Sequence, residues 1–147
     1  METPHHLQHH ELTDKIIRAF FDTYNELAGF PEFVVQRAMA ITLHDEGLDL
    51  ESEKPLQVWF RGRRLVTFKA DLVVQSSVIV EIKVKPEIDP FNRVQLLHYL
   101  KATDLEVGLL LNFGRRPEFS RVIFERQRKR VRFEPPDTAV DASRDTQ

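Results

Sequence analysis

Three charged residues lie within stretches of sequence that are otherwise largely apolar. Asp71 lies in the segment 65–74, and Glu81 and Lys83 lie in the segment 78–84, which is rich in β-branched residues. Side chains two positions apart in a strand point to the same face, so Glu81 and Lys83 share a face. If the two segments pair as strands through the short turn between them, Asp71 falls opposite the region of Glu81. Two carboxylates and an ammonium group would then converge on one face of a sheet.

Such a cluster suits a divalent cation and phosphate chemistry. Two carboxylates a few ångströms apart repel, which raises the pKa of one of them unless a cation joins them. Mg²⁺ or Mn²⁺ prefers oxygen ligands and leaves positions for water and a phosphate oxygen. A bound ion polarises the phosphoryl group and lowers the pKa of its water, and Lys83 could orient that water or stabilise charge on the phosphate. The alternative is that these residues make cross-strand salt bridges on an exposed sheet, each worth under about 1 kcal/mol.

Residues on two predicted helices could complete the cluster. Gln95 and Tyr99 are four residues apart and therefore share one helix face, where they could contact substrate or hold Lys83. Ordinary half-buried helix residues are the alternative for both. Glu32 opens another predicted helix, and a carboxylate near a helix N-terminus is favoured by about 0.3–1 kcal/mol for structural reasons alone. The functional interpretation makes Glu32 a third carboxylate that reaches the metal directly or through water.

The elements that must position these residues follow from the spacing of the apolar side chains. A period of about 3.6 changes to a period of two at Pro55, which marks the change from helices to a β-hairpin. Helices are predicted at 12–27, 31–46 and 90–103, and strands at 55–60, 65–74, 78–84, 107–111 and 122–124. The inner side of the second helix is predicted to carry Val34, Val35, Ala38, Ile41 and Thr42. The order α-α-β-β-β-α-β-β predicts an α/β fold with a mixed central β-sheet flanked by helices.

Composition limits the chain to one globular domain. Its 147 residues are 41% hydrophobic and 30% charged, with a formal net charge of −2, so no global basic field indicates a nucleic-acid partner. The absence of cysteine excludes a disulfide framework, a thiolate zinc site and a cysteine nucleophile. No apolar run approaches the roughly 18 residues of a membrane span, and no secretory h-region is found, so we expect a cytoplasmic protein without membrane contact.

Both ends of the chain differ from the middle in composition. Residues 1–11 are polar and carry four of the six histidines, so we expect a disordered leader before a domain at 12–124. Residues 125–147 are basic and then polar, and we expect a disordered tail. Basic residues on the hairpin, after the strand at 107–111 and in the tail could contact phosphates, although a basic tail can also be merely solvated. They are Arg61, Arg63, Arg64, Lys69, Arg115, Arg116, Arg126, Arg128, Lys129, Arg130 and Arg132.

Several of these stretches together resemble a known family. They are Gly29-Phe30-Pro31-Glu32, Arg61-Gly62-Arg63-Arg64, Ala70-Asp71-Leu72, Val80-Glu81-Ile82-Lys83, the run from Gln95 to Thr103 and the run from Gly108 to Gly114. In these motifs residues 12–124 resemble the GxxExxY proteins, small prokaryotic proteins of the PD-(D/E)xK nuclease superfamily. The resemblance implies a restriction-endonuclease-like core. In place of the tyrosine that names the family this chain carries Val35, and in place of the glutamate that commonly follows it carries Gln36.

The resemblance also implies a metal site. Asp71 and Glu81 would ligate Mg²⁺ or Mn²⁺, helped by the main-chain carbonyl of Ile82. Lys83 would be the motif lysine, and Glu32 would be the helix carboxylate. These five residues are therefore the expected metal-binding and catalytic set.

The remaining implications concern substrate and function. Gln95 and Tyr99 match the Q-x-x-x-Y motif of the exonuclease-like branch, and we expect them to bind substrate together with Arg63 and Arg64. We expect a metal-dependent nuclease that hydrolyses phosphodiester bonds of DNA, with RNA the less favoured substrate, and that could act as a homodimer. The alternative is a catalytically inactive nucleic-acid- or protein-binding module that retains the nuclease fold. The two departures from the family pattern favour this alternative, whereas the intact acidic cluster argues against it, because drift would remove such a destabilising cluster first.

Overall fold

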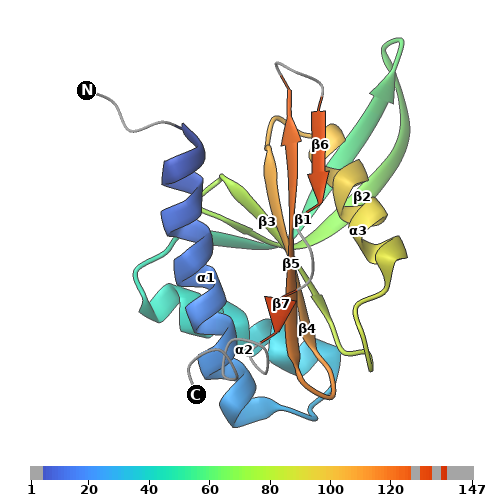
Figure 1. Cartoon of the computed structure of the whole chain (residues 1–147). Helices are drawn as coiled ribbons and strands as arrows, with labels where there is room; N and C mark the ends of the chain where they lie inside the picture. Colours follow the sequence, from blue (N-terminus) through green and yellow to red (C-terminus); the bar gives the residue numbers. More distant parts are fainter. Residues whose placement is uncertain (1–4, 127–129, 134–136, 139–147) are drawn as a thin grey trace.

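A mixed sheet of seven strands forms the centre of the part of the chain that the structure describes (Figure 1). The computed structural model describes residues 5–126, 130–133 and 137–138. Its helices are α1 (His5–Leu27), α2 (Glu32–Asp45) and α3 (Pro90–Lys101). Its strands are β1 (Leu50–Phe60), β2 (Arg63–Val74), β3 (Val78–Lys83), β4 (Val107–Phe113), β5 (Pro117–Glu125), β6 (Arg130–Phe133) and β7 (Asp137–Thr138). The strands pair in the order β1-β2-β3-β4-β5-β6 with β7 on β5, and β3 and β4 are the parallel pair. The predicted α/β fold with a mixed sheet is confirmed.

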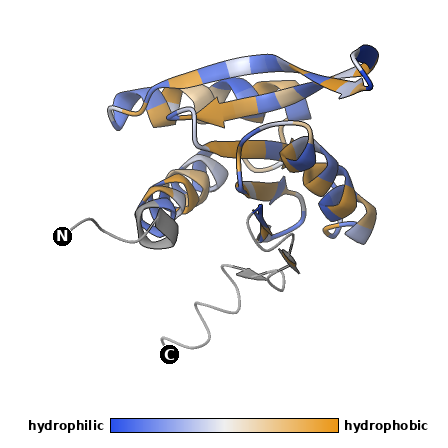
Figure 2. Ribbon diagram, turned by 90° about the horizontal axis from the view of Figure 1, so that it is seen from above, coloured by the Kyte–Doolittle hydropathy of each residue, from blue (hydrophilic) through white to orange (hydrophobic). Residues whose placement is uncertain are grey.

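The helices cover both faces of the sheet, with α1 and α2 on one face and α3 on the other (Figure 2). Phe20 of α1 belongs to the same core cluster as Val80 of β3. On the opposite face, Leu96 of α3 belongs to the same cluster as Ile79 of β3 and Leu110 of β4. Side chains of β3 therefore alternate between two apolar layers, which is why this strand reads as a nearly continuous apolar run. Among the described residues, no helix has the length and hydropathy needed to cross a membrane.

The buried side of α2 differs from the predicted one. Val35, Met39 and Leu43 are fully buried, whereas Ile41 is 63% exposed. The prediction for Ile41 is wrong because α2 carries apolar residues around much of its circumference, so their spacing alone does not select a face. The row of residues four apart that contains Val35 packs against α1 and the sheet.

The chain ends also differ from prediction within the described ranges. α1 begins at His5, so residues 5–11 are helical and the expected leader is wrong for them; residues 1–4 lie outside the described residues. No proline or glycine separates this segment from the amphipathic helix that follows, so the helix continues into it. β6 and β7 pair with β5 in the expected tail, where Val131 packs against the α3-side cluster. Residues 127–129, 134–136 and 139–147 lie outside the described residues.

β1 and β2 form a long hairpin that extends beyond the helices (Figure 1). Arg61 and Gly62 make its two-residue turn, with φ values of 50° and 75°. Positive φ at both central positions is what the type I′ turn of a tight hairpin requires. The ladder continues to Leu50 and Val74 at the base of the hairpin. The predicted hairpin and its turn are confirmed, and β1 begins earlier than predicted.

Candidate active site

Asp71 and Glu81 meet where β2 and β3 separate. The antiparallel ladder between these strands ends at Leu72 and Val80, one residue short of the two acids. There the side chains replace the ladder: the Asp71 backbone N–H donates to Glu81 Oε1 at 3.0 Å, and the Ile82 backbone N–H donates to Asp71 Oδ2 at 2.8 Å. Each carboxyl group therefore binds the backbone of the opposite strand. The juxtaposition expected from the short turn between the two strands is present.

Burial perturbs both carboxyl groups. Glu81 is 4% exposed, and burial together with the nearby charge of Asp71 raises the pKa of Glu81 to about 8. Burial also raises the pKa of Asp71, although the Ile82 N–H and the charge of Lys83 oppose this rise. A pKa of about 8 means that Glu81 carries a proton at neutral pH.

Lys83 and Glu32 lie within the electrostatic field of this pair. Lys83 is half-buried two residues beyond Glu81, and its positive charge lowers the pKa values of Asp71 and Glu81. Glu32 opens α2; partial burial raises the pKa of Glu32, the charge of Lys83 opposes the rise, and the charge of Asp71 adds to it. No three acidic or histidine side chains among the described residues form a group that could hold a metal ion. Glu32 is therefore a neighbour of the pair and does not form a three-carboxylate cluster with it.

Gln36, one turn along α2 from Glu32, ties this helix to the site. Its Nε2 donates to the backbone carbonyl of Asp71 at 3.3 Å. Val35 beside it is fully buried in the core between α2 and the sheet. The two contacts hold the first turn of α2 beside the pair. In the sequence Gln36 is only a departure from the family pattern, because a side chain that bonds to a distant backbone carbonyl leaves no local signal.

Tyr99 and Gln95 approach the site from α3. Tyr99 is 5% exposed, and burial raises its pKa to about 12, with the charges of Glu81 and Asp71 adding to the rise. The ring centroids of Tyr99 and Phe68 lie 5.0 Å apart, which fixes the phenol beside the sheet. Gln95 is half-buried and makes no hydrogen bond to another described residue, so its amide can bind a ligand. The structure thus places Tyr99 beside the acids, and Gln95 lies one turn before it on the same helix.

A polar network that sequence analysis missed holds the chain just after Lys83. Asn112 is fully buried and exchanges hydrogen bonds of 2.9 Å with the backbone N–H and carbonyl of Lys85. The Lys85 ammonium donates to Asn92 Oδ1 at 3.1 Å. A Cβ at Gly114 would lie 1.7 Å from the Lys85 carbonyl oxygen, so this close approach requires glycine. The available signal in the sequence was an amide directly after the apolar run at 107–111.

The hairpin arginines lie away from the carboxyl pair. Arg63 and Arg64 are exposed at the turn of the hairpin, and Arg63 is eight positions from Asp71 along β2. At about 3.3 Å per residue the separation is about 26 Å. The structure therefore does not bring these two predicted substrate-binding residues to the pair.

Arg126 has a structural role at the end of α3 that the sequence did not indicate. Its guanidinium donates to the backbone carbonyls of Leu100 and Thr103 and, at 2.9 Å, to that of Leu105. These carbonyls lie at and just after the end of α3, where backbone acceptors lack helical partners. The expectation that Arg126 contacts phosphate is therefore wrong. The other basic side chains of the tail, those of Arg128, Lys129, Arg130 and Arg132, lie outside the described residues.

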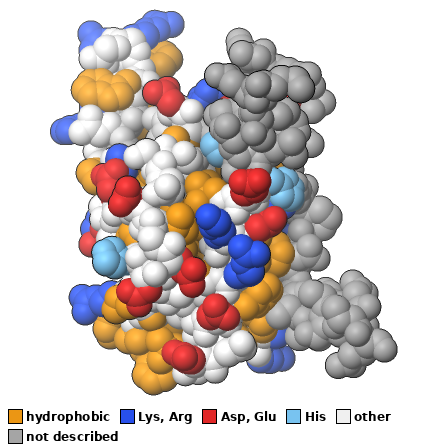
Figure 3. Space-filling model, turned by 90° about the vertical axis from the view of Figure 1, so that its left-hand side faces the viewer, with side chains coloured by type: hydrophobic (Ala, Val, Ile, Leu, Met, Phe, Trp, Pro, Cys, Tyr) orange, Lys and Arg blue, Asp and Glu red, His pale blue; other side chains and the backbone are white. Residues whose placement is uncertain are grey.

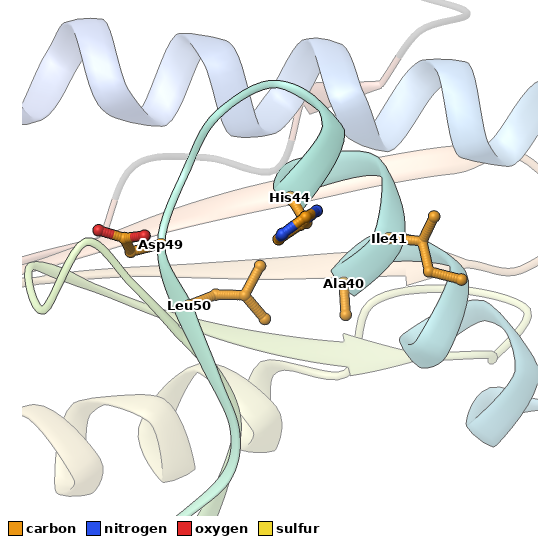
Figure 4. A pocket seen from close by; sticks show the side chains of 5 residues that line it. All are labelled: Ala40, Ile41, His44, Asp49 and Leu50. Carbon is orange, nitrogen blue, oxygen red and sulfur yellow. The ribbon is translucent and has the colours of Figure 1, made fainter.

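An open cavity of about 400 Å³ lies between α2 and the start of β1 (Figure 4). Its lining is mostly apolar, with one histidine and one aspartate: Ala40, Ile41, His44, Asp49 and Leu50. None of the predicted site residues lines it. The carboxyl pair, and not this cavity, is the candidate active site.

Comparison with known proteins supports this assignment. The model of a family described as the PD-(D/E)XK nuclease superfamily matches residues 10–122. The chain belongs to the PD-(D/E)XK nuclease superfamily. No curated protein and no solved structure matches the chain. As a PD-(D/E)XK chain, it carries an acid at Asp71 and an acid-x-lysine run at Glu81, Ile82 and Lys83, and the fold brings them together.

PD-(D/E)XK nucleases generally use divalent metals, and the residues of this site fit such an ion. Asp71 uses Oδ2 and Glu81 uses Oε1 for hydrogen bonds to backbone N–H groups, which leaves one oxygen of each side chain for another partner. Glu81, whose pKa is about 8, carries a proton at neutral pH, and a divalent cation could replace that proton. The donors are all oxygen atoms, the ligand type that Mg²⁺ and Mn²⁺ prefer.

Proposed function

We propose that this chain is a metal-dependent nuclease that hydrolyses the phosphodiester bonds of DNA at the pair formed by Asp71 and Glu81. The observation that carries the proposal is the meeting of two carboxyl groups beside Lys83, the half-buried Asp71 and the buried Glu81, each bound to the backbone of the opposite strand. A structural salt bridge would place the ammonium group of Lys83 on these acids. Among the described residues, no hydrogen bond or ion pair joins Lys83 to a partner, so the charge of the pair is left for a proton or a cation.

The metal would be held by a small set of oxygen atoms. Asp71 and Glu81 would bind Mg²⁺ or Mn²⁺ directly, with the main-chain carbonyl of Ile82 as a further ligand. Glu32 would act through water, because it lies in the field of the pair without forming one group with it. When bound, such an ion polarises the phosphate and lowers the pKa of coordinated water.

The chain's own groups would position water and substrate. Lys83 would orient the attacking water or donate to the phosphate as negative charge develops there, since its ammonium group has no competing acceptor among the described residues. Tyr99 would donate a hydrogen bond to the substrate, because a pKa of about 12 keeps the phenol protonated at neutral pH. Gln95 would offer its amide from the same helix face. Within the superfamily, the motifs that contain these residues support membership of the GxxExxY family.

A second candidate function is a binding module that has lost catalysis. Two observations favour it: Val35 is buried in the core where the family carries its tyrosine, and Gln36 places a neutral amide on the backbone of Asp71 where the family commonly carries a glutamate. Both changes lie on the helix turn that also carries Glu32. The cleavage experiment below separates the two functions.

A cleavage assay with matched lysine variants tests the proposal. The full chain is incubated with labelled single-stranded and double-stranded DNA, and with RNA, in Mg²⁺, Mn²⁺ or EDTA. Lys83→Ala is compared with the control Lys15→Ala, which removes an exposed lysine from α1. We expect cleavage of DNA by the wild type and by the control in metal only, and a loss of about 100- to 1,000-fold in Lys83→Ala.

Each alternative outcome has a definite meaning. Cleavage that survives in Lys83→Ala would remove the proposed site. Binding of DNA by the folded wild type, without cleavage in any metal, would establish the binding module instead. Melting temperatures that agree among the three proteins show that the variants are folded.

A further inference from the structure

The tip of the hairpin of β1 and β2 exposes large apolar side chains. Trp59 and Phe60 are 58% and 55% exposed on β1, and Leu65 and Val66 are 63% and 42% exposed on β2. The register places these residues within a few pairs of the turn on both strands. Exposed apolar residues that cluster in this way mark a binding surface more often than a solvated one. We call residues 57–67, which include this tip, the arm.

The charge around the tip selects the kind of partner. Residues 55–70 contain Arg61, Arg63, Arg64 and Lys69 and no acidic residue. Because the whole chain carries a formal net charge of −2, the residues outside this stretch carry −6. The Arg61 guanidinium carbon lies 5.0 Å from the centroid of the Phe60 ring, so cationic and aromatic groups share the tip. Figure 3 shows the arm at the upper left, with basic side chains at its end above hydrophobic ones. Such a surface complements a polyanion and repels a second copy of itself.

The arm is connected to the candidate active site by a continuous strand. β2 runs from Arg63 at the turn to Asp71 and beyond, and it pairs with β1 along most of this length, with a register shift between Val58 and Trp59. At its base, Phe68 packs against Tyr99, which lies beside the acids. The separation of about 26 Å between the arm tip and Asp71 corresponds to between seven and eight base pairs, because duplex DNA rises about 3.4 Å per base pair.

From these observations we infer that the arm is a second contact for duplex DNA, about eight base pairs from the phosphate at the carboxyl pair. Arg63 and Arg64 bind phosphates there, and Trp59 and Phe60 pack against the sugars and bases beside them. The inference rests on the proposed function for its substrate class. It adds a binding site distant from the acids and a minimum substrate length that the acids alone do not require.

The chain contains a single tryptophan, so its fluorescence reports on the arm directly. The full chain is titrated in EDTA, where the DNA stays intact, with duplexes of about 8, 12, 16 and 24 base pairs. The double variant Arg63→Ala/Arg64→Ala is compared with a control, Lys15→Ala/Arg18→Ala, which removes two exposed basic residues from α1. Binding is measured by Trp59 fluorescence and by polarisation of labelled DNA at several salt concentrations.

We expect DNA to change the Trp59 fluorescence of the wild type and of the control. Affinity should rise steeply once the duplex exceeds about eight base pairs, which spans the distance from the pair to the arm. In Arg63→Ala/Arg64→Ala the affinity should fall about 10-fold and the slope of log affinity against log salt should decrease by about 2, one for each lost phosphate contact. The steep dependence on length should disappear as well.

Two results would overturn the inference. One is a wild-type protein that binds DNA with unchanged Trp59 fluorescence and with the same affinity and salt slope as the arm variant. The other is an arm that mediates self-association, seen as a mass that rises with protein concentration and falls in the arm variant, without a response to DNA. Failure of the nuclease proposal is distinguishable, because binding in EDTA is measured without cleavage and Lys83→Ala should retain the arm signal.

Discussion

The proton held by Glu81 makes a quantitative prediction for the variant Glu81→Gln. The folded pKa of Glu81 is about 8, against an ordinary value near 4.5 in the unfolded chain. Between these two values the folded protein holds a proton that the unfolded chain has lost, so the free energy of unfolding must fall as the pH rises. Between about pH 5.5 and 8.5 this fall amounts to about 3 kcal/mol.

Substitution by glutamine should remove this dependence without removing the hydrogen bond from the Asp71 N–H. The new amide oxygen can accept from the Asp71 N–H as the carboxyl oxygen does, and the neutral amide has no charged form for burial to disfavour. The variant should therefore match the wild type near pH 5.5 and be more stable by about 3 kcal/mol near pH 8.5. A domain of this size gains about 2–4 °C of melting temperature per kcal/mol, so the difference should be about 6–12 °C.

Thermal unfolding in EDTA across this pH range measures the effect. Glu26→Gln is the matched control, because Glu26 is exposed on α1 and the substitution makes the same chemical change. Melting temperatures of wild type and Glu81→Gln that run parallel across the range would refute the reasoning. So would a variant that is less stable than the wild type near pH 8.5, because the glutamate would then be held as a stable carboxylate.

Three further predictions concern ion binding at the carboxyl pair, the close approach at Gly114 and the contacts of Arg126. Binding of Mg²⁺ at pH 7 should release about one proton per ion, as titration calorimetry in two buffers of different ionisation enthalpy would show. Binding without proton release would contradict the protonated state of Glu81. Gly114→Ala should lower the free energy of unfolding by about 1–3 kcal/mol, because its Cβ would overlap the Lys85 carbonyl, and an unchanged melting temperature would mean that this approach is looser than described. Arg126→Met should lower the free energy of unfolding, measured by chemical denaturation, by about 1–3 kcal/mol, because it removes a charged donor from three backbone carbonyls. An unchanged free energy of unfolding would return Arg126 to the candidates for phosphate binding.

Apolar periodicity predicted the inner part of the fold well and its borders poorly. β3 and β4 are buried on both faces, so their uninterrupted apolar runs identify them without knowledge of their partners. β6 is an edge strand of four residues whose one described side chain, Val131, packs against the core. A run this short between basic residues gives too few periods to distinguish from a tail, and its pairing depends on the free edge that β5 offers. Arg126 was misassigned for a related reason, since a charge pattern shows where basic residues cluster but not which carbonyls lie nearby.

In the candidate site, too, some contacts can be predicted from the spacing of residues in the sequence, and others depend on the three-dimensional fold. The short turn between β2 and β3 determines that Asp71 lies opposite Glu81, so this juxtaposition was predictable. The proximity of Glu32 was not, because it depends on the contact of Gln36 with the Asp71 carbonyl, which joins α2 to a strand 35 positions away. Whether Lys83 pairs with the acids also depends on where the network of Asn112 and Lys85 holds the end of β3.

The separation of β2 and β3 explains both the orientation of the two acids and their raised pKa values. Where the ladder stops, the N–H groups of Asp71 and Ile82 lose their carbonyl partners, and buried N–H groups without acceptors are costly. The two carboxyl groups supply those acceptors, which fixes their orientation on the opposite strand. Because the same arrangement buries Glu81 close to the charge of Asp71, Glu81 keeps a proton that it would lose in water. A divalent cation at this position would therefore bind acids that the backbone has already aligned, and the free energy stored in their burial would be recovered when the ion displaces the proton.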